Sequence, residues 1–67
     1  MVNMKTKLPQ HLIAAYEWID SANEWHEALT DPAYAQAAYE NGLEHGGEFD
    51  LSDIRDAIEW KRAQVAS

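Results

Sequence analysis

The sequence predicts an all-α fold, a small three-helix bundle with helices over about 9–29, 32–45 and 51–65. Apolar residues recur with helical spacing in the first and last of these segments, and turn-forming residues separate the three. No stretch alternates polar and apolar residues as a strand would. The 67 residues are too few for a second domain, so we expect a single helical domain over 1–67 with residues 1–7 flexible.

The first predicted helix has a broad apolar stripe. At 100° per residue its large and small apolar side chains fall within one half of the helical wheel, which is typical of a helix that faces a core. Pro9 is tolerated in the first turn, where a backbone N–H has no helical partner. The members of the stripe are Leu12, Ala15, Tyr16, Trp18, Ile19, Ala22, Trp25 and Leu29.

The second predicted helix begins after Thr30-Asp31-Pro32. An aspartate side chain accepts the free amide hydrogens of a first turn, and proline fits the first helical position. Four alanines between residues 33 and 38 favour a helix intrinsically. We expect the helix to end near Gly42 or at Gly46-Gly47, because glycine adopts the left-handed conformation that terminates helices.

The third predicted helix has a capping box at its start. Asp50 is the expected cap and Asp53 the reciprocal acceptor, while Phe49 and Ile54 are spaced as a hydrophobic staple. The apolar residues that follow predict a core stripe of Leu51, Ile54, Ile58 and Val65, with the Lys61 stem covering its edge.

Composition argues against several classes of function. The chain has no cysteine, which removes disulfides, thiol catalysis and thiolate metal sites. No apolar run approaches the length of a membrane span, and the amino terminus lacks the apolar core of a secretory signal, so we expect a cytoplasmic protein. Without a phosphate-binding glycine loop, a basic patch or a hydroxyl placed beside a histidine, we expect neither an enzyme nor direct nucleic-acid binding.

Metal and cofactor sites are not predicted either. His11, His26 and His45 are not joined by the spacings that bring two ligands together on one helix. Residues 48–59 place oxygen side chains at several positions of a calcium-binding loop, but Asp53 occupies the position that requires glycine. We therefore expect no metal ion and no cofactor.

The distribution of charge is the most informative functional feature. The net charge is −7, and the 47 residues from Leu8 to Ile54 contain no lysine or arginine. A field of one sign attracts basic surfaces and repels nucleic acid and anionic membranes. The same segment carries ten of the twelve carboxylates: Glu17, Asp20, Glu24, Glu27, Asp31, Glu40, Glu44, Glu48, Asp50 and Asp53.

Four of these carboxylates are spaced to form one acidic stripe along the first predicted helix. They are Glu17, Asp20, Glu24 and Glu27, and no basic residue on that helix neutralises them. The third predicted helix differs, because Arg55 with Glu59 and Glu59 with Arg62 have the spacing of neutralising pairs. The stripe is interpreted either as a solubilising face or as a docking surface for a basic partner.

Trp60 is predicted to lie opposite the core stripe of its helix, beside Asp53 and Asp56. An exposed tryptophan surrounded by carboxylates is typical of an interface anchor. The alternative is that the second helix or another subunit covers it. The predicted partner-binding residues are thus Glu17, Asp20, Glu24, Glu27, Asp53, Asp56 and Trp60.

These observations favour a non-enzymatic, acidic protein-binding module. The hypothesis is an inhibitor or antagonist that docks a negative helical face onto a basic, nucleic-acid-handling protein. By composition the chain is similar to phage-encoded and mobile-element inhibitors that imitate the charge of DNA. The alternative is a homodimer or other structural assembly, or an adaptor of the antitoxin kind, that binds through exposed aromatic residues.

Overall fold

The computed structural model describes residues 7–66, and within this range the chain is helical without strands. The predicted all-α bundle is confirmed. Most of the segment 1–7 that was predicted to be flexible lies outside the described residues. The elements are a 3-10 turn η1 (Gln10–Leu12) and the helices α1 (Ile13–Ala22), α2 (Trp25–Thr30), α3 (Tyr34–Glu44) and α4 (Leu51–Ala66).

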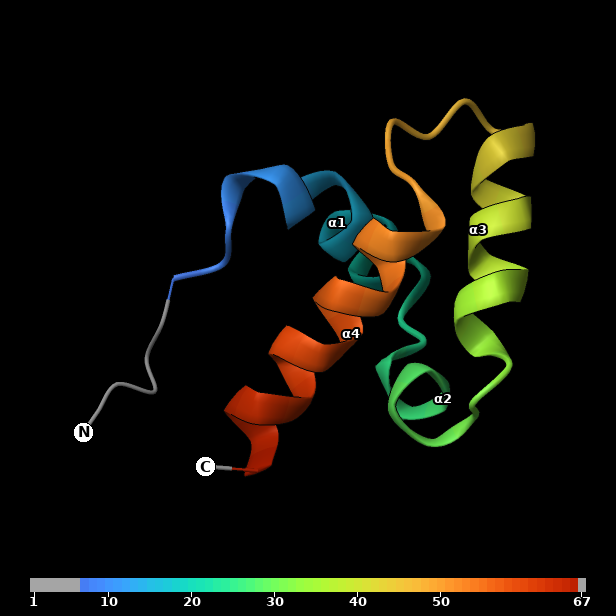
Figure 1. The fold of residues 1–67 in the computed structure, drawn as a ribbon. Coiled ribbons are helices and arrows are strands. Elements are labelled where there is room, and N and C mark those ends of the chain that lie inside the picture. Colours follow the sequence, from blue (N-terminus) through green and yellow to red (C-terminus); the bar gives the residue numbers. More distant parts are fainter. Residues whose placement is uncertain (1–6, 67) are drawn as a thin grey trace.

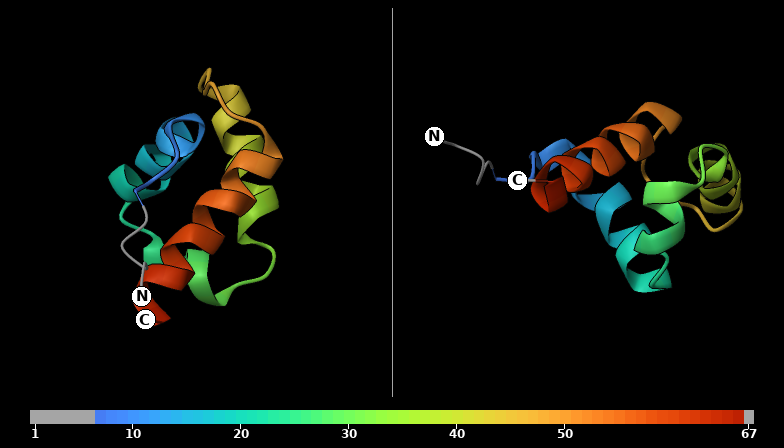
Figure 2. Two further views of the ribbon diagram at one scale, coloured as in Figure 1. Left: turned by 60° about the vertical axis from the view of Figure 1, so that its left-hand side comes forward. Right: turned by 90° about the horizontal axis from the view of Figure 1, so that it is seen from below.

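The longest helix, α4, packs against every other element. It contacts η1, α1, α2 and α3, and Figure 1 shows it crossing in front of α1 with α3 to one side. Figure 2 shows α1 and α3 on different sides of α4. The core lies between these helices, where Ile19 of α1 and Ile54 of α4 are fully buried. The other core residues are Leu12, Ala15, Ala28, Tyr34, Ala38, Phe49, Ala57 and Ile58.

The first predicted helix is divided in two, which corrects the prediction of one helix over 9–29. Asn23 has φ 58° and ψ 42°, the left-handed conformation that ends a helix. Its N–H donates to the carbonyl of Asp20, and the N–H of Glu24 donates to that of Ile19, the bond pattern of a Schellman motif. Asparagine tolerates this conformation better than most residues. Asn23 was therefore the signal in the sequence that could have predicted the end of α1.

The second predicted helix begins two residues later than expected and ends where expected. Asp31 Oδ1 accepts a hydrogen bond from the N–H of Ala33, so the predicted cap acts on a turn that precedes α3. Of the two predicted stops, the second is correct, because Gly46 has φ 75°. Gly42 lies within α3, where a Cβ atom would stand 2.5 Å from the ring of Phe49. Its role is to admit this ring to the core.

The start of α4 shows the Asp53 half of its predicted capping box. Asp53 Oδ2 accepts a hydrogen bond from the N–H of Asp50 over 3.2 Å, which is one half of a capping box. The predicted core stripe is correct at Ile54 and Ile58 but wrong at Val65, which is 63% exposed. Val65 lies near the end of α4, beyond the part of the helix that the core residues cover.

The left-handed Asn23 predicts a substitution pattern. Asn23→Ala should lower the free energy of unfolding by about 1 kcal/mol, because a Cβ-bearing residue without a local polar contact is strained there. Asn23→Gly should be tolerated. Asn41→Ala, within α3, is the matched control and should raise stability slightly through helix propensity. Urea denaturation measures all three variants, and equal effects at positions 23 and 41 would contradict the assignment.

Candidate functional site

The predicted acidic stripe does not lie along one helix. Because the chain turns at Asn23, Glu17 and Asp20 belong to α1, Glu24 precedes α2, and Glu27 lies on α2. All four side chains are exposed. The four carboxylates are therefore distributed over two helices and the joint between them. Their neighbours in the fold are residues that helical spacing alone does not indicate.

Two of these carboxylates accept hydrogen bonds from neutral aromatic donors. Asp20 Oδ1 accepts from Trp25 Nε1 over 2.9 Å, which fastens α2 to α1. Glu24 Oε1 accepts from the hydroxyl of Tyr34 over 2.9 Å, which fastens the same joint to α3. A neutral donor satisfies a carboxylate without cancelling its charge, so both groups still contribute to the negative field.

The hydroxyl of Tyr34 lies within that negative field. Burial raises the pKa of Tyr34 above its ordinary value of 10.0, and so do the hydrogen bond to Glu24 and the charges of Glu24 and Glu27. Both carboxylates thus act on one buried hydroxyl.

Glu17 lies elsewhere, in a shallow depression of about 510 Å³ between α1 and the connection from α3 to α4. Glu48 lines the same depression and was missing from the predicted set. Its wall includes Trp18, which packs against the rings of His45 and Phe49 with centroid separations of 5.6 and 6.1 Å. The Gly46-Gly47 turn that brings Glu48 to α1 was visible in the sequence, but its direction was not.

Two carboxylates beside an indole form a suitable environment for a cation. A lysine or arginine side chain there would be attracted by both negative charges and by the aromatic ring. The structure places no described lysine or arginine in this depression. We refer to the depression lined by Glu17, Trp18 and Glu48 as the acidic notch.

Trp60 is half-buried, which corrects the prediction of an exposed anchor. Its ring meets Tyr16 of α1 edge-on, with centroids 5.8 Å apart and planes at 82°. Its Nε1 is buried and has no hydrogen-bond partner among the described residues. Asp53 is half-buried as well and caps α4, whereas Asp56 is exposed. These three residues therefore do not form the predicted ring of carboxylates around a free indole.

Lys61 explains part of this packing. Its ammonium lies 5.5 Å from the ring centroid of Tyr16 and 5.1 Å from that of Trp25. It also donates a hydrogen bond to the Tyr16 hydroxyl over 3.2 Å. The Lys61 stem was expected to cover the edge of the core. Its ammonium also interacts with aromatic rings, and not with a carboxylate.

Ion pairs are scarce in the part of the chain that the structure describes. Arg62 pairs with Glu59 at 2.9 Å as predicted, and this is the one ion pair within residues 7–66. The second predicted pair, Arg55 with Glu59, is not formed, because Glu59 turns toward Arg62. None of the ten carboxylates between Leu8 and Ile54 is paired with a described basic residue.

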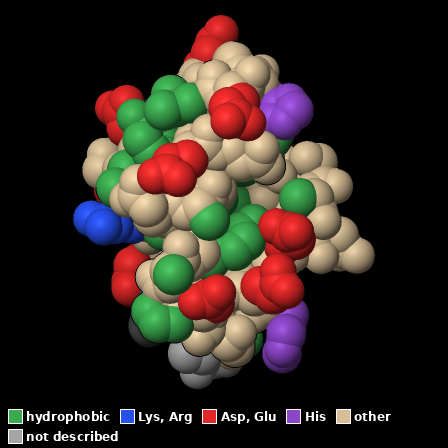
Figure 3. Space-filling view, turned by 90° about the vertical axis from the view of Figure 1, so that its right-hand side faces the viewer, with side chains coloured by type: hydrophobic (Ala, Val, Ile, Leu, Met, Phe, Trp, Pro, Cys, Tyr) green, Lys and Arg blue, Asp and Glu red, His purple; other side chains and the backbone are tan. Residues whose placement is uncertain are grey.

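The surface that α3 presents is correspondingly acidic. Figure 3 shows Asp and Glu side chains spread across this face, with a Lys or Arg side chain seen only at its edge. Glu40 and Glu44 of α3 are both exposed. Glu40 accepts a hydrogen bond from Gln36 over 2.8 Å, again a neutral donor.

Within residues 7–66, no group of three or more His, Asp or Glu side chains is arranged to hold a metal ion. No described helix has the length and apolar character needed to cross a membrane. Comparisons with protein-family models, curated proteins and solved structures find no match for this chain.

The raised pKa of Tyr34 predicts a loss of stability in alkali. Above about pH 10 the unfolded chain releases this proton more readily than the folded chain, so the free energy of unfolding falls as pH rises toward the folded pKa. Tyr34→Phe should lower stability at neutral pH, because Glu24 loses its donor, but should make the alkaline decline shallower.

Urea denaturation at about pH 8 and about pH 11 measures this decline. Tyr39→Phe is the matched control, since Tyr39 is half-buried on the same helix. It should keep the wild-type dependence on pH. An equally steep decline in Tyr34→Phe and in the wild type would show that Tyr34 is not the responsible group.

Proposed function

We propose that this chain is a non-enzymatic protein-binding module that docks its negative surface onto a basic surface of a nucleic-acid-handling protein and so acts as an inhibitor or antagonist. The observation that supports this most is the absence of internal counterions: no carboxylate between Leu8 and Ile54 forms an ion pair within the described residues. A folded surface with unneutralised charge attracts a partner of opposite sign and speeds its encounter.

The contact surface is best assigned to carboxylates that are exposed and make no hydrogen bond within the described residues. Of the predicted set these are Glu17, Glu27 and Asp56, and Glu48 joins them through the acidic notch. Asp20, Glu24 and Asp53 are already bonded to internal donors. They add to the field but are less free to reorient toward a partner.

The acidic notch offers the most specific contact for such a partner. A lysine or arginine entering it would lie between Glu17 and Glu48 and against Trp18, so that charge and ring face act together. Contacts of this kind determine orientation more than total affinity, whereas the surrounding field governs the association rate. The proposal therefore predicts binding that weakens steeply with salt.

Imitation of nucleic acid follows from the same charge. Proteins that bind DNA neutralise closely spaced phosphates with lysine and arginine. A rigid helical frame with many exposed carboxylates presents a comparable field to those side chains, while the chain itself is repelled by nucleic acid. A cytoplasmic inhibitor encoded by a phage or a mobile element would use the surface in this way.

A second candidate function is a homo-oligomeric assembly or an adaptor of the antitoxin kind. The aromatic residues favour it less than expected, since Trp60 is half-buried against Tyr16. The exposed large apolar side chains are instead Ile13, Leu43 and Val65, which lie on three different helices. Binding through these residues would persist at high salt, which separates the two functions.

A capture experiment with matched variants tests the proposed function. The immobilised full chain is exposed to a lysate rich in nucleic-acid-binding proteins, and bound proteins are eluted with salt or displaced with duplex DNA. The double variant Glu17→Gln/Glu48→Gln should weaken the captured complex about tenfold.

The control variant is Glu40→Gln/Glu59→Gln, which changes the net charge equally but alters carboxylates already bonded to Gln36 and Arg62. It should retain binding. The acidic docking surface would be refuted if the captured proteins resist elution by salt or displacement by DNA. It would also be refuted if both double variants capture them as tightly as the wild type.

A further inference from the structure

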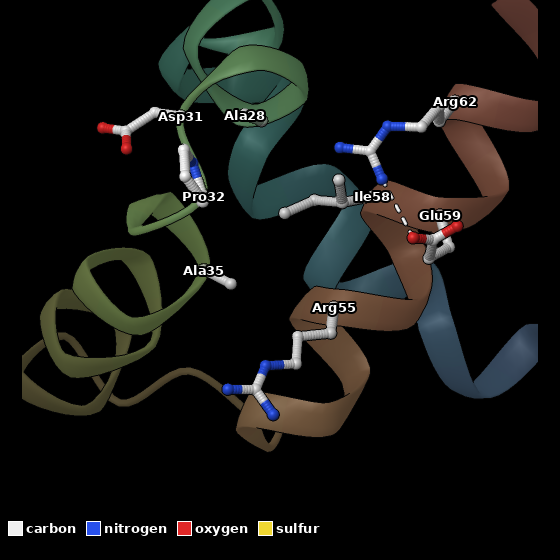
Figure 4. Close-up of a pocket in the computed structure, with 8 residues that line it drawn as sticks. All are labelled: Ala28, Asp31, Pro32, Ala35, Arg55, Ile58, Glu59 and Arg62. Carbon is white, nitrogen blue, oxygen red and sulfur yellow. Dashed lines mark hydrogen bonds and ion pairs between the residues drawn. The ribbon is translucent and has the colours of Figure 1, made fainter.

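A second concavity lies on a different part of the molecule, between α4 and the connection that joins α2 to α3. It is a groove of about 450 Å³ whose floor is apolar. Figure 4 shows Ile58 of α4 directed toward α2, α3 and their connection, where Ala28, Ala35 and Pro32 line the same space. Ala28 and Ile58 belong to the buried core, so the floor of the groove is a rigid part of the fold.

The rim of this groove carries both arginines of the chain. Arg55 and Arg62 are seven residues apart on α4, which places them on one side of the helix about 10 Å apart along its axis. This is unexpected in a protein with a net charge of −7. The two arginines lie together at one groove, which Asp31 and Glu59 also line.

The two arginines are held differently. Arg62 donates to Glu59 over 2.9 Å and to the carbonyl of Leu29 over 3.3 Å, so its guanidinium already has an anionic partner and a backbone partner. Arg55 forms no hydrogen bond or ion pair within the described residues, and Figure 4 shows its guanidinium directed toward α3. The end of the groove at Arg55 is therefore its positive end.

Two carboxylates line the groove, and neither forms an ion pair with Arg55 within the described residues, because Glu59 pairs with Arg62 and Asp31 is directed elsewhere. Asp31 also lines the groove, but its Oδ1 accepts a hydrogen bond from the N–H of Ala33. Figure 4 shows its carboxylate pointing away from α4 and from both arginines. An apolar floor with one unpaired guanidinium at its end is complementary to an apolar body that carries a single anionic group.

We propose that this groove binds a small amphiphilic carboxylate, with the carboxylate on Arg55 and the apolar body over Ile58 and Ala35. Guanidinium geometry favours a carboxylate because two parallel hydrogen bonds form at once. The volume suits a small molecule. An extended acidic polypeptide would meet repulsion from the carboxylates on the rest of the surface, whereas a single carboxylate brings only one charge.

This site is separate from the acidic notch and does not depend on the proposed function. The two concavities share no lining residue. The acidic notch is lined by the unpaired carboxylates of Glu17 and Glu48. In the groove the carboxylates of Asp31 and Glu59 already have partners, and Arg55 is the charged group without one, so opposite charges in a ligand distinguish the two sites.

Titration of the full chain with octanoate tests the proposal, followed by two-dimensional NMR. Saturable shifts should appear at Arg55, Ile58 and Ala35 below about 10 mM octanoate. Acetate carries the charge without the apolar body and octanol the apolar body without the charge, so both should bind more weakly. Arg55→Gln should weaken octanoate binding about fivefold.

Lys7→Gln is the matched control, because it removes one positive charge from an exposed residue that does not line the groove. It should leave octanoate binding unchanged. The proposal is overturned if octanoate produces no saturable shift or if octanol binds as tightly as octanoate. It is also overturned if Arg55→Gln and Lys7→Gln bind octanoate with equal affinity. Binding of a peptide with an apolar carboxyl-terminal residue, but not of octanoate, would also overturn it in favour of a polypeptide ligand.

Discussion

The structure depends on one constraint: the carboxylates of residues 8–54 have to be satisfied without cations. Five of the ten accept hydrogen bonds from neutral donors, namely the indole of Trp25, the hydroxyl of Tyr34, the amide of Gln36 and backbone N–H groups. Each of these bonds fixes a helix or a turn while leaving the negative charge in place. Others, such as Glu17, Glu27 and Glu48, are exposed and make no hydrogen bond within the described residues. The folded chain therefore keeps the negative charge of these carboxylates, which remains available to solvent and to partners.

The two bonds at the joint between α1 and α2 show how this constraint determines the architecture. The left-handed turn at Asn23 redirects the chain so that Trp25 reaches back to Asp20 and packs on Tyr16, with ring centroids 4.8 Å apart. Glu24 then reaches Tyr34 at the start of α3. Lys61 covers the aromatic rings from α4. One of the few basic residues is thus used on aromatic faces, and the carboxylates nearby stay unpaired.

Much of the fold follows from local rules and could be predicted from the sequence. Asp31 and Pro32 mark the turn before α3, Gly46 ends it, and Asp53 caps α4, because these effects act over three or four residues. The break at Asn23 could not be predicted from apolar periodicity, which continues through it from Ile19 to Leu29. The packing of Trp60 against Tyr16 depends on a contact between distant segments, and so does the depression that Glu17 and Glu48 both line. The sequence therefore predicted the residue types of the candidate site, but not which of them lie together.

The dependence of folding stability on ionic strength tests the central claim most directly, because it measures whether the carboxylates lack counterions within the molecule. Between about 10 and 100 mM sodium chloride the screening length shortens from about 30 to about 10 Å, so repulsion among unpaired charges weakens. The account predicts that the free energy of unfolding in urea at neutral pH rises over this range. A constant or falling free energy of unfolding would show that the carboxylates are balanced by internal cations and would contradict the account.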